Sequence, residues 1–100
     1  MLSPPNPDLL RPFAHRYIWW ETPEKAVKYP EHVVAQVMNN GNLEAIQAIE
    51  KTVGKDYLKH VLTTAEIGMF SPASWHFWHY RLEMVQPDQA VPPMPIRKVA

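Results

Sequence analysis

The sequence predicts an all-α fold, a small bundle of about four to five helices with extended, proline-rich arms at the N- and C-termini. Apolar residues recur three and four positions apart through the middle of the chain, which is the spacing of an amphipathic helix. Prolines gather within the first dozen and the last fourteen residues, where they oppose helix propagation. Alternating runs typical of strands do not occur, apart from a short one at residues 17–20.

A chain of 100 residues has room for one modest core. We therefore expect a single helical domain over residues 1–100, with residues 1–7 and 87–100 as the extended arms. A short helix is expected near residues 8–15. The strand-like run that follows it is interpreted as an apolar lead-in that packs on the bundle, and residues 23–28 are expected to form a turn.

Three amphipathic helices are expected next, near residues 30–40, 42–53 and 55–67. Asn42 is placed to cap the second, and Glu44 lies in its first turn, where the helix dipole favours negative charge. Each helix carries an apolar stripe at helical spacing. The stripes are Val33, Val34, Val37 and Met38; Leu43, Ile46, Ile49 and Val53; and Leu58, Val61, Leu62 and Ala65.

Prolines and glycines mark the expected helix ends. Pro23, Pro30 and Pro72 each suit the first position of a helix, and Thr22 and Ser71 place a capping hydroxyl before two of them. A glycine follows each of the three apolar stripes, where a residue in the left-handed conformation would end the helix. These glycines are Gly41, Gly54 and Gly68.

The last expected helix, near residues 72–84, is crowded with aromatic and histidine side chains. In the favoured interpretation, Trp75, Trp78 and Leu82 fill the centre of the bundle, and Trp19 and Trp20 pack against them. In the functional interpretation, the helix presents an exposed aromatic patch to a protein partner, because Trp, Tyr and Arg carry much of the binding energy at interfaces. The candidate partner-binding residues are Trp75, Trp78, His79, Tyr80 and Arg81.

Composition excludes several function classes. Ten Lys and Arg balance ten Asp and Glu, so no general field steers the protein toward nucleic acid or an anionic membrane. Because the chain has no cysteine, disulfides, thiolate metal sites and a cysteine nucleophile are excluded. The N-terminal residues lack the pattern of a secretory signal, and no apolar run is long enough to span a membrane. We therefore expect a cytoplasmic protein that does not associate with membranes.

Candidate chemistry centres on histidine. His76 and His79 stand three residues apart on the last helix, a separation at which two imidazoles can share a metal ion. Such a site needs a further ligand, and no cysteine or inward-facing carboxylate is evident, so we expect neither a metal nor another cofactor. Ser71 and Ser74 are the serines nearest these histidines, but Ser71 is better explained as a helix cap. We expect no catalytic residues and no enzymatic activity.

A helix-turn-helix DNA-binding regulator is the alternative function. The last three expected helices have suitable lengths, with Gly68 in the turn and the final helix in the recognition position. That helix offers Trp, Phe, His and Tyr rather than side chains that read base edges, so nucleic acid is not the favoured partner. The candidate DNA contacts are Lys51, Lys55, Lys59 and Arg81.

The C-terminal tail offers a second possible contact. Residues 91–97 read Val-Pro-Pro-Met-Pro-Ile-Arg, a sequence that would hold a polyproline II conformation and lose little entropy on docking. The sequence leaves three docking sites for the tail open: its own domain, a second copy in a homodimer, and another protein.

Three segments resemble a family of small bacterial helical proteins of uncharacterised function. They are YIWW at residues 17–20, VAQVMNNG at 34–41, and SWHFWHYRL at 74–82 with its Val-Pro-Pro-x-Pro tail, so the resemblance covers nearly the whole chain. That family is similar to short antitoxin-like helical proteins, some of which are encoded beside nucleotidyltransferase-type toxins. The resemblance implies a toxin-partner role and no active-site residue. We therefore expect a non-enzymatic protein-interaction module that acts as an antitoxin-like partner of another bacterial protein.

Overall fold

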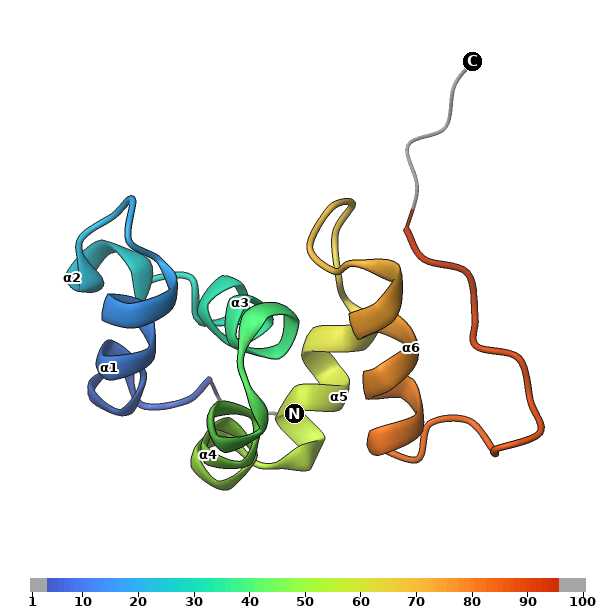
Figure 1. The fold of residues 1–100 in the computed structure, drawn as a ribbon. Helices are drawn as coiled ribbons and strands as arrows, with labels where there is room; N and C mark the ends of the chain where they lie inside the picture. The colour runs from blue at the N-terminus through green and yellow to red at the C-terminus, as the bar shows by residue number, and fades with distance from the viewer. Residues whose placement is uncertain (1–3, 96–100) are drawn as a thin grey trace, which may run out of the picture.

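The computed structural model describes residues 4–95, and this part of the chain forms helices and no strands (Figure 1). The predicted all-α bundle is confirmed. The expectations for residues 1–3 and for Ile96 and Arg97 of the tail lie outside the described residues. The helices are α1 (Pro7–Tyr17), α2 (Pro23–Ala26), α3 (Pro30–Asn40), α4 (Leu43–Val53), α5 (Lys55–Thr63) and α6 (Pro72–Arg81).

The bundle is built around α3, which contacts α1, α2, α4, α5 and α6. Figure 1 shows it between the α1–α2 pair and the α5–α6 pair, with α4 below it. Its apolar residues lie on more than one side of the helix, so neighbours can cover it from several directions. The buried residues of α3 are Val33, Val34, Ala35, Val37 and Met38. The central helix is therefore α3, and the aromatic helix α6 packs against it.

The predicted helix starts are confirmed by their caps. Amides in the first turns of α2, α4 and α6 donate to the side-chain oxygens of Thr22, Asn42 and Ser71, respectively. Each of these hydrogen bonds satisfies an amide that has no partner within its own helix. The sequence therefore located these starts correctly, although residues 23–28 contain the short helix α2 rather than only a turn.

Two helix ends differ from the prediction. α5 stops at Thr63 rather than near residue 67, and the hydroxyls of Thr63 and Thr64 both donate to the carbonyl of His60 at this end, at 3.1 and 2.7 Å. α6 stops at Arg81 rather than near residue 84, because Glu83 adopts the left-handed conformation with φ 57°. Such a residue ends a helix just as a glycine does.

The glycine prediction is correct at one helix end and wrong at another. Gly54 has φ 83° and ends α4, as expected. Gly41 has φ −72°, so its conformation is open to any residue, and the reason for glycine is space instead. A Cβ atom at Gly41 would lie 2.6 Å from the carbonyl oxygen of Val37 and 3.0 Å from the Cβ of Ala45. Gly68 has φ 84° but lies in the loop beyond α5.

Three residues that were expected inside the bundle lie on its surface. Leu43 begins α4 and is 60% exposed. Trp19 and Trp20 are 81% and 54% exposed, so the prediction that they pack against the aromatic helix is wrong. The chain leaves α1 at Ile18, whose side chain is buried, and the next two residues form a turn that faces solvent.

None of the helices in residues 4–95 has the length and apolar content needed to span a bilayer.

Candidate functional site

The buried face of α6 joins this helix to the end of α3. Trp78 is fully buried, and its indole N–H donates to the carbonyl of Met38 at 2.8 Å. The hydroxyl of Ser74 donates to the carbonyl of Asn39 at 3.2 Å, and the Asn39 side chain accepts from the amide of Ser71 at 2.9 Å. Carbonyls at a helix C-terminus have no partner within their own helix, so α6 supplies donors that the end of α3 requires.

The two histidines of α6 have different environments. His79 is buried, and its Nδ1 donates to the carbonyl of Trp75 at 2.7 Å. A carbonyl can only accept, so Nδ1 carries the proton and Nε2 is the acceptor in the neutral ring. His76 is exposed and makes the equivalent bond to the carbonyl of Pro72 at 2.8 Å. Within residues 4–95, no group of three His, Asp or Glu side chains is placed to hold a metal ion.

Arg81 forms an ion pair that ties α6 to α4. Its Nε and Nη2 atoms each lie 2.8 Å from a carboxylate oxygen of Glu50, a bidentate geometry. The hydrogen bond from Arg81 lowers the pKa of Glu50 below its ordinary 4.5, against the opposing effect of burial. The hydrogen bond to Glu50 likewise raises the pKa of Arg81. The guanidinium also lies over the ring of Phe77, 5.7 Å from its centroid.

The predicted partner-binding residues therefore do not form one open surface. Trp75, Trp78 and His79 are buried in the bundle, in agreement with the favoured structural interpretation of this helix. Arg81 is paired with Glu50. Tyr80 is 40% exposed, and its hydroxyl donates to the carbonyl of a tail residue.

The lysines predicted to contact DNA do not form a continuous helical strip. Lys51 belongs to α4, whereas Lys55 and Lys59 belong to α5. The two helices are separated by Gly54, whose positive φ breaks the helical repeat, so the four-residue spacing from Lys51 to Lys55 does not place them on one face. Only Lys55 and Lys59 share a helix face.

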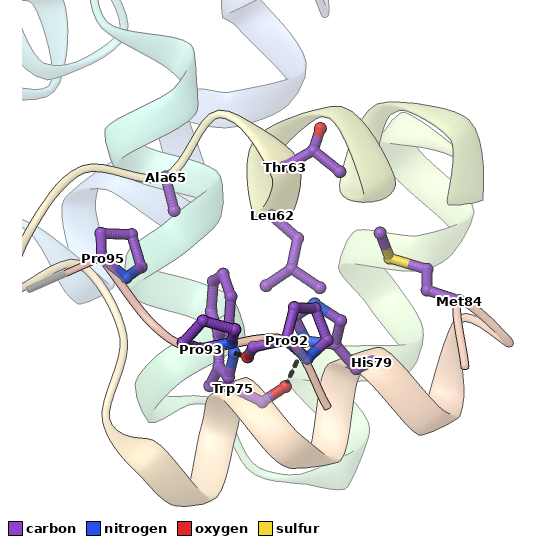
Figure 2. Close-up of a pocket in the computed structure, with 9 residues that line it drawn as sticks. All are labelled: Leu62, Thr63, Ala65, Trp75, His79, Met84, Pro92, Pro93 and Pro95. Atoms are coloured by element: carbon purple, nitrogen blue, oxygen red, sulfur yellow. Dashed lines mark hydrogen bonds between the residues drawn. The ribbon is translucent and has the colours of Figure 1, made fainter. Parts of the chain in front are cut away.

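The C-terminal tail lies along a groove between the end of α5 and α6 (Figure 2). The indole N–H of Trp75 donates to the carbonyl of Pro92 at 2.7 Å, and the hydroxyl of Tyr80 donates to the carbonyl of Gln89 at 2.9 Å. Val91 and Met94 pack against the hydrophobic core. A cavity of about 380 Å³ remains between the tail and the helices, lined by residues that include Leu62, Trp75, His79, Met84, Pro92 and Pro93.

A second surface feature is the pair formed by Trp19 and Trp20 in the turn between α1 and α2. Their rings meet edge to face, with centroids 5.5 Å apart. Sequence reasoning missed this surface because it treated residues 17–20 as one apolar segment. The apolar run does not distinguish Ile18, whose side chain is buried, from the two tryptophans, which lie in the turn and are exposed.

A third feature is a polar hollow of about 280 Å³ between the first turn of α3 and the end of α5. Its lining includes Glu31, His32, His60, Thr64 and Glu66. Nearby, the hydroxyl of Tyr57 is buried, and no residue in the described part of the chain forms a hydrogen bond with it. Burial raises the pKa of Tyr57 to about 12, and the charge of Glu31 adds to the rise.

Comparisons of the chain with protein-family models, with curated proteins and with solved structures found no significant match.

Proposed function

We propose that this chain is a non-enzymatic protein-interaction module, an antitoxin-like partner of another bacterial protein, and that Trp19 and Trp20 are its main contact residues. The observation that supports this proposal is the exposure of two adjacent indoles, 81% and 54%, on a domain whose other two tryptophans are buried. Large apolar rings that face water are unfavourable unless a partner covers them.

Tryptophan is among the residues that contribute most to binding at protein interfaces. It offers a large contact area and loses little conformational entropy, because its side chain has only two rotatable bonds. The turn that carries the pair is fixed on both sides. The amide of Ile18 closes α1 by donating to Ala14, and the Thr22 hydroxyl caps α2. The backbone that carries both rings is therefore fixed on either side before a partner arrives.

The surface of α6 favours a protein partner over duplex DNA. The exposed side chains of this helix include His76, Phe77 and Tyr80, which are not the residues that read base edges in a major groove. Arg81, the arginine of this helix, directs the edge of its guanidinium formed by Nε and Nη2 at Glu50. An equal number of acidic and basic residues also provides no net attraction to phosphates.

The proposal is tested by affinity capture of the full-length chain from its native cells, followed by calorimetry with the purified partner. Replacing both exposed indoles, as Trp19→Ser with Trp20→Ser, should weaken the complex by about 30-fold or more, which corresponds to about 2 kcal/mol. Leu43→Ser is the matched control, since Leu43 is similarly exposed on α4, and it should bind normally. Equal binding by all three chains would contradict the proposal.

The antitoxin-like role requires a separate growth assay. Expression of the partner alone should arrest growth, and co-expression of the natural chain should relieve the arrest, whereas the chain with both serine substitutions should not. If the partner has no effect on growth, the antitoxin-like role is contradicted, whereas the role as a protein-interaction module still stands. Tight, strongly salt-dependent binding to duplex DNA, together with the absence of a protein partner, would instead support the regulator.

A further inference from the structure

We propose that the groove between the end of α5 and α6 is a binding site for proline-rich peptide segments, and that the chain's own residues 89–95 are its resident ligand. A proline-rich segment of a partner protein would displace this tail and take its place. The proposal concerns a different surface from Trp19 and Trp20 and does not depend on them.

Two hydrogen bonds to backbone carbonyls fasten the tail to α6. Trp75 and Tyr80 each donate to a carbonyl, those of Pro92 and Gln89. Pro92 lies in the extended, proline-rich part of the tail, whereas Gln89 lies at a bend that closes a turn from Gln86. The donors are five residues apart on α6 and therefore lie on different faces of the helix, with Trp75 buried and Tyr80 exposed. The bond to Pro92 therefore holds the extended segment in the groove, and the bond to Gln89 holds the bend that precedes it.

The tail is conformationally restricted. Pro92, Pro93 and Pro95 each fix their own φ near −65° and hold the preceding residue in an extended conformation. Residues 90–95 accordingly contain no helix or turn. Val91 and Met94, three residues apart, pack against the core with their apolar side chains. Such a segment loses little entropy when it docks, which is the basis of proline-rich recognition by aromatic grooves.

The tail leaves part of the groove unfilled. A pocket of about 380 Å³ beside Pro92 and Pro93 is partly open to solvent, and its lining includes the buried side chains of Leu62, Trp75 and His79. Figure 2 shows these side chains facing the two prolines across the space. A ligand with the same backbone contacts and a larger apolar side chain at this point would bury more surface than the tail does.

Displacement of the tail would not require a helix to unfold. α6 ends at Arg81, and its last carbonyls are satisfied within the turn that follows, by the amides of Glu83 and Met84. The segment between this turn and Gln89 can therefore move while α6 keeps its hydrogen bonds. Because the tail is tethered, it competes at an effective concentration in the millimolar range, and the intact chain should bind an outside segment weakly.

The test uses the full-length chain with its tail weakened and a synthetic peptide of residues 86–95 as the probe. Val91→Asp with Met94→Asp places two charges against the core and should release the tail. The indole N–H signal of Trp75, assigned in NMR spectra by its loss in Trp75→Phe, should shift on release and return on addition of the peptide. Peptide affinity should be at least 10-fold higher for this released chain than for the natural chain.

Two controls separate specific recognition of the peptide from non-specific binding. A peptide with alanine in place of Pro92, Pro93 and Pro95 should bind at least 5-fold more weakly, because it loses more entropy on docking. Adding Tyr80→Phe to the released chain removes one donor while leaving the core intact, and should weaken the natural peptide several-fold. Pro92→Ala with Pro93→Ala and Pro95→Ala gives a second released chain without a buried charge, in case the aspartates disturb the fold.

The proposal is overturned if either released chain keeps its helical circular dichroism but fails to bind the peptide, or if it binds the alanine peptide equally well. Sedimentation of the natural chain tests whether the tail of a second copy occupies the groove instead. A dimer that disappears in both released chains and in Trp75→Phe would assign the groove to the tail of a second copy and overturn the assignment to a partner protein.

Discussion

Tyr57 has a fully buried hydroxyl that no other residue in the described part of the chain bonds. The ring is only 4% exposed and belongs to the hydrophobic core, so its packing is favourable. The hydroxyl has lost its hydrogen bonds to water without replacement, which costs about 1 to 3 kcal/mol. The same burial, with the charge of Glu31, raises the pKa of Tyr57 to about 12.

We expect Tyr57→Phe to raise the free energy of unfolding at pH 7 by about 1 kcal/mol, because it removes the unsatisfied group and keeps the ring. The natural chain should also lose stability at alkaline pH. From pH 10 to about 12 the phenol ionises in the unfolded chain but stays protonated in the folded one, so stability falls by about 2 to 3 kcal/mol. Urea denaturation at pH 7, 10 and 11.5 measures both effects.

Tyr57→Phe should lack the loss of stability that ionisation of Tyr57 causes at alkaline pH. The difference in stability between the two chains therefore separates the effect of Tyr57 from the titration of lysines. Tyr29→Phe is the control, since Tyr29 is exposed and its substitution should change neither the stability at pH 7 nor its pH dependence. Parallel pH curves for the natural chain and Tyr57→Phe would show that the hydroxyl finds a partner or water in solution.

At the scale of elements, the sequence predicts helix starts better than helix ends. Thr22, Asn42 and Ser71 cap their helices as expected, because a cap depends on residues only three positions away. The end of α6 was missed, because its left-handed position holds Glu83, a residue that gives no such signal. The bond between Trp78 and Met38, forty residues apart, could not be inferred at all from local spacing.

The turn after α6 is a Schellman motif, and it makes a specific prediction. The amide of Met84 donates to the carbonyl of His79 at 2.9 Å, and the amide of Glu83 donates to that of Tyr80 at 3.1 Å. The left-handed conformation costs a residue with a Cβ about 1 kcal/mol, and glycine avoids this cost. We expect Glu83→Gly to raise the free energy of unfolding by about 0.5 to 1 kcal/mol, measured by thermal and urea denaturation.

Glu66→Gly serves as the matched control for this substitution. Glu66 is also an exposed loop glutamate, but its φ is not positive, so glycine there relieves no strain and only adds freedom to the unfolded chain. Glu66→Gly should therefore lower the free energy of unfolding slightly. An equal loss in both variants would mean that the turn after α6 is not held in the left-handed conformation in solution.

At the scale of the whole molecule, the four tryptophans divide into two groups with opposite roles. Trp75 and Trp78 are buried on α6, as the favoured interpretation of the sequence predicts. Their helical spacing places them on one inward face. Trp19 and Trp20 were assigned to the same core and lie outside it. Their position depends on the direction in which the chain leaves α1, and no residue pattern at that point specifies it.

This division should be visible in solution by fluorescence quenching. In the natural chain, acrylamide or iodide should quench two classes of indole, because two of the four are exposed and two are buried. Trp19→Phe with Trp20→Phe should remove the accessible class and shift the remaining emission to shorter wavelength. Trp75→Phe should instead leave the accessible class unchanged. If a partner covers the exposed pair, its addition to the natural chain should reduce quenching to the level seen for Trp19→Phe with Trp20→Phe. Unchanged quenching in the complex would place the interface elsewhere on the molecule.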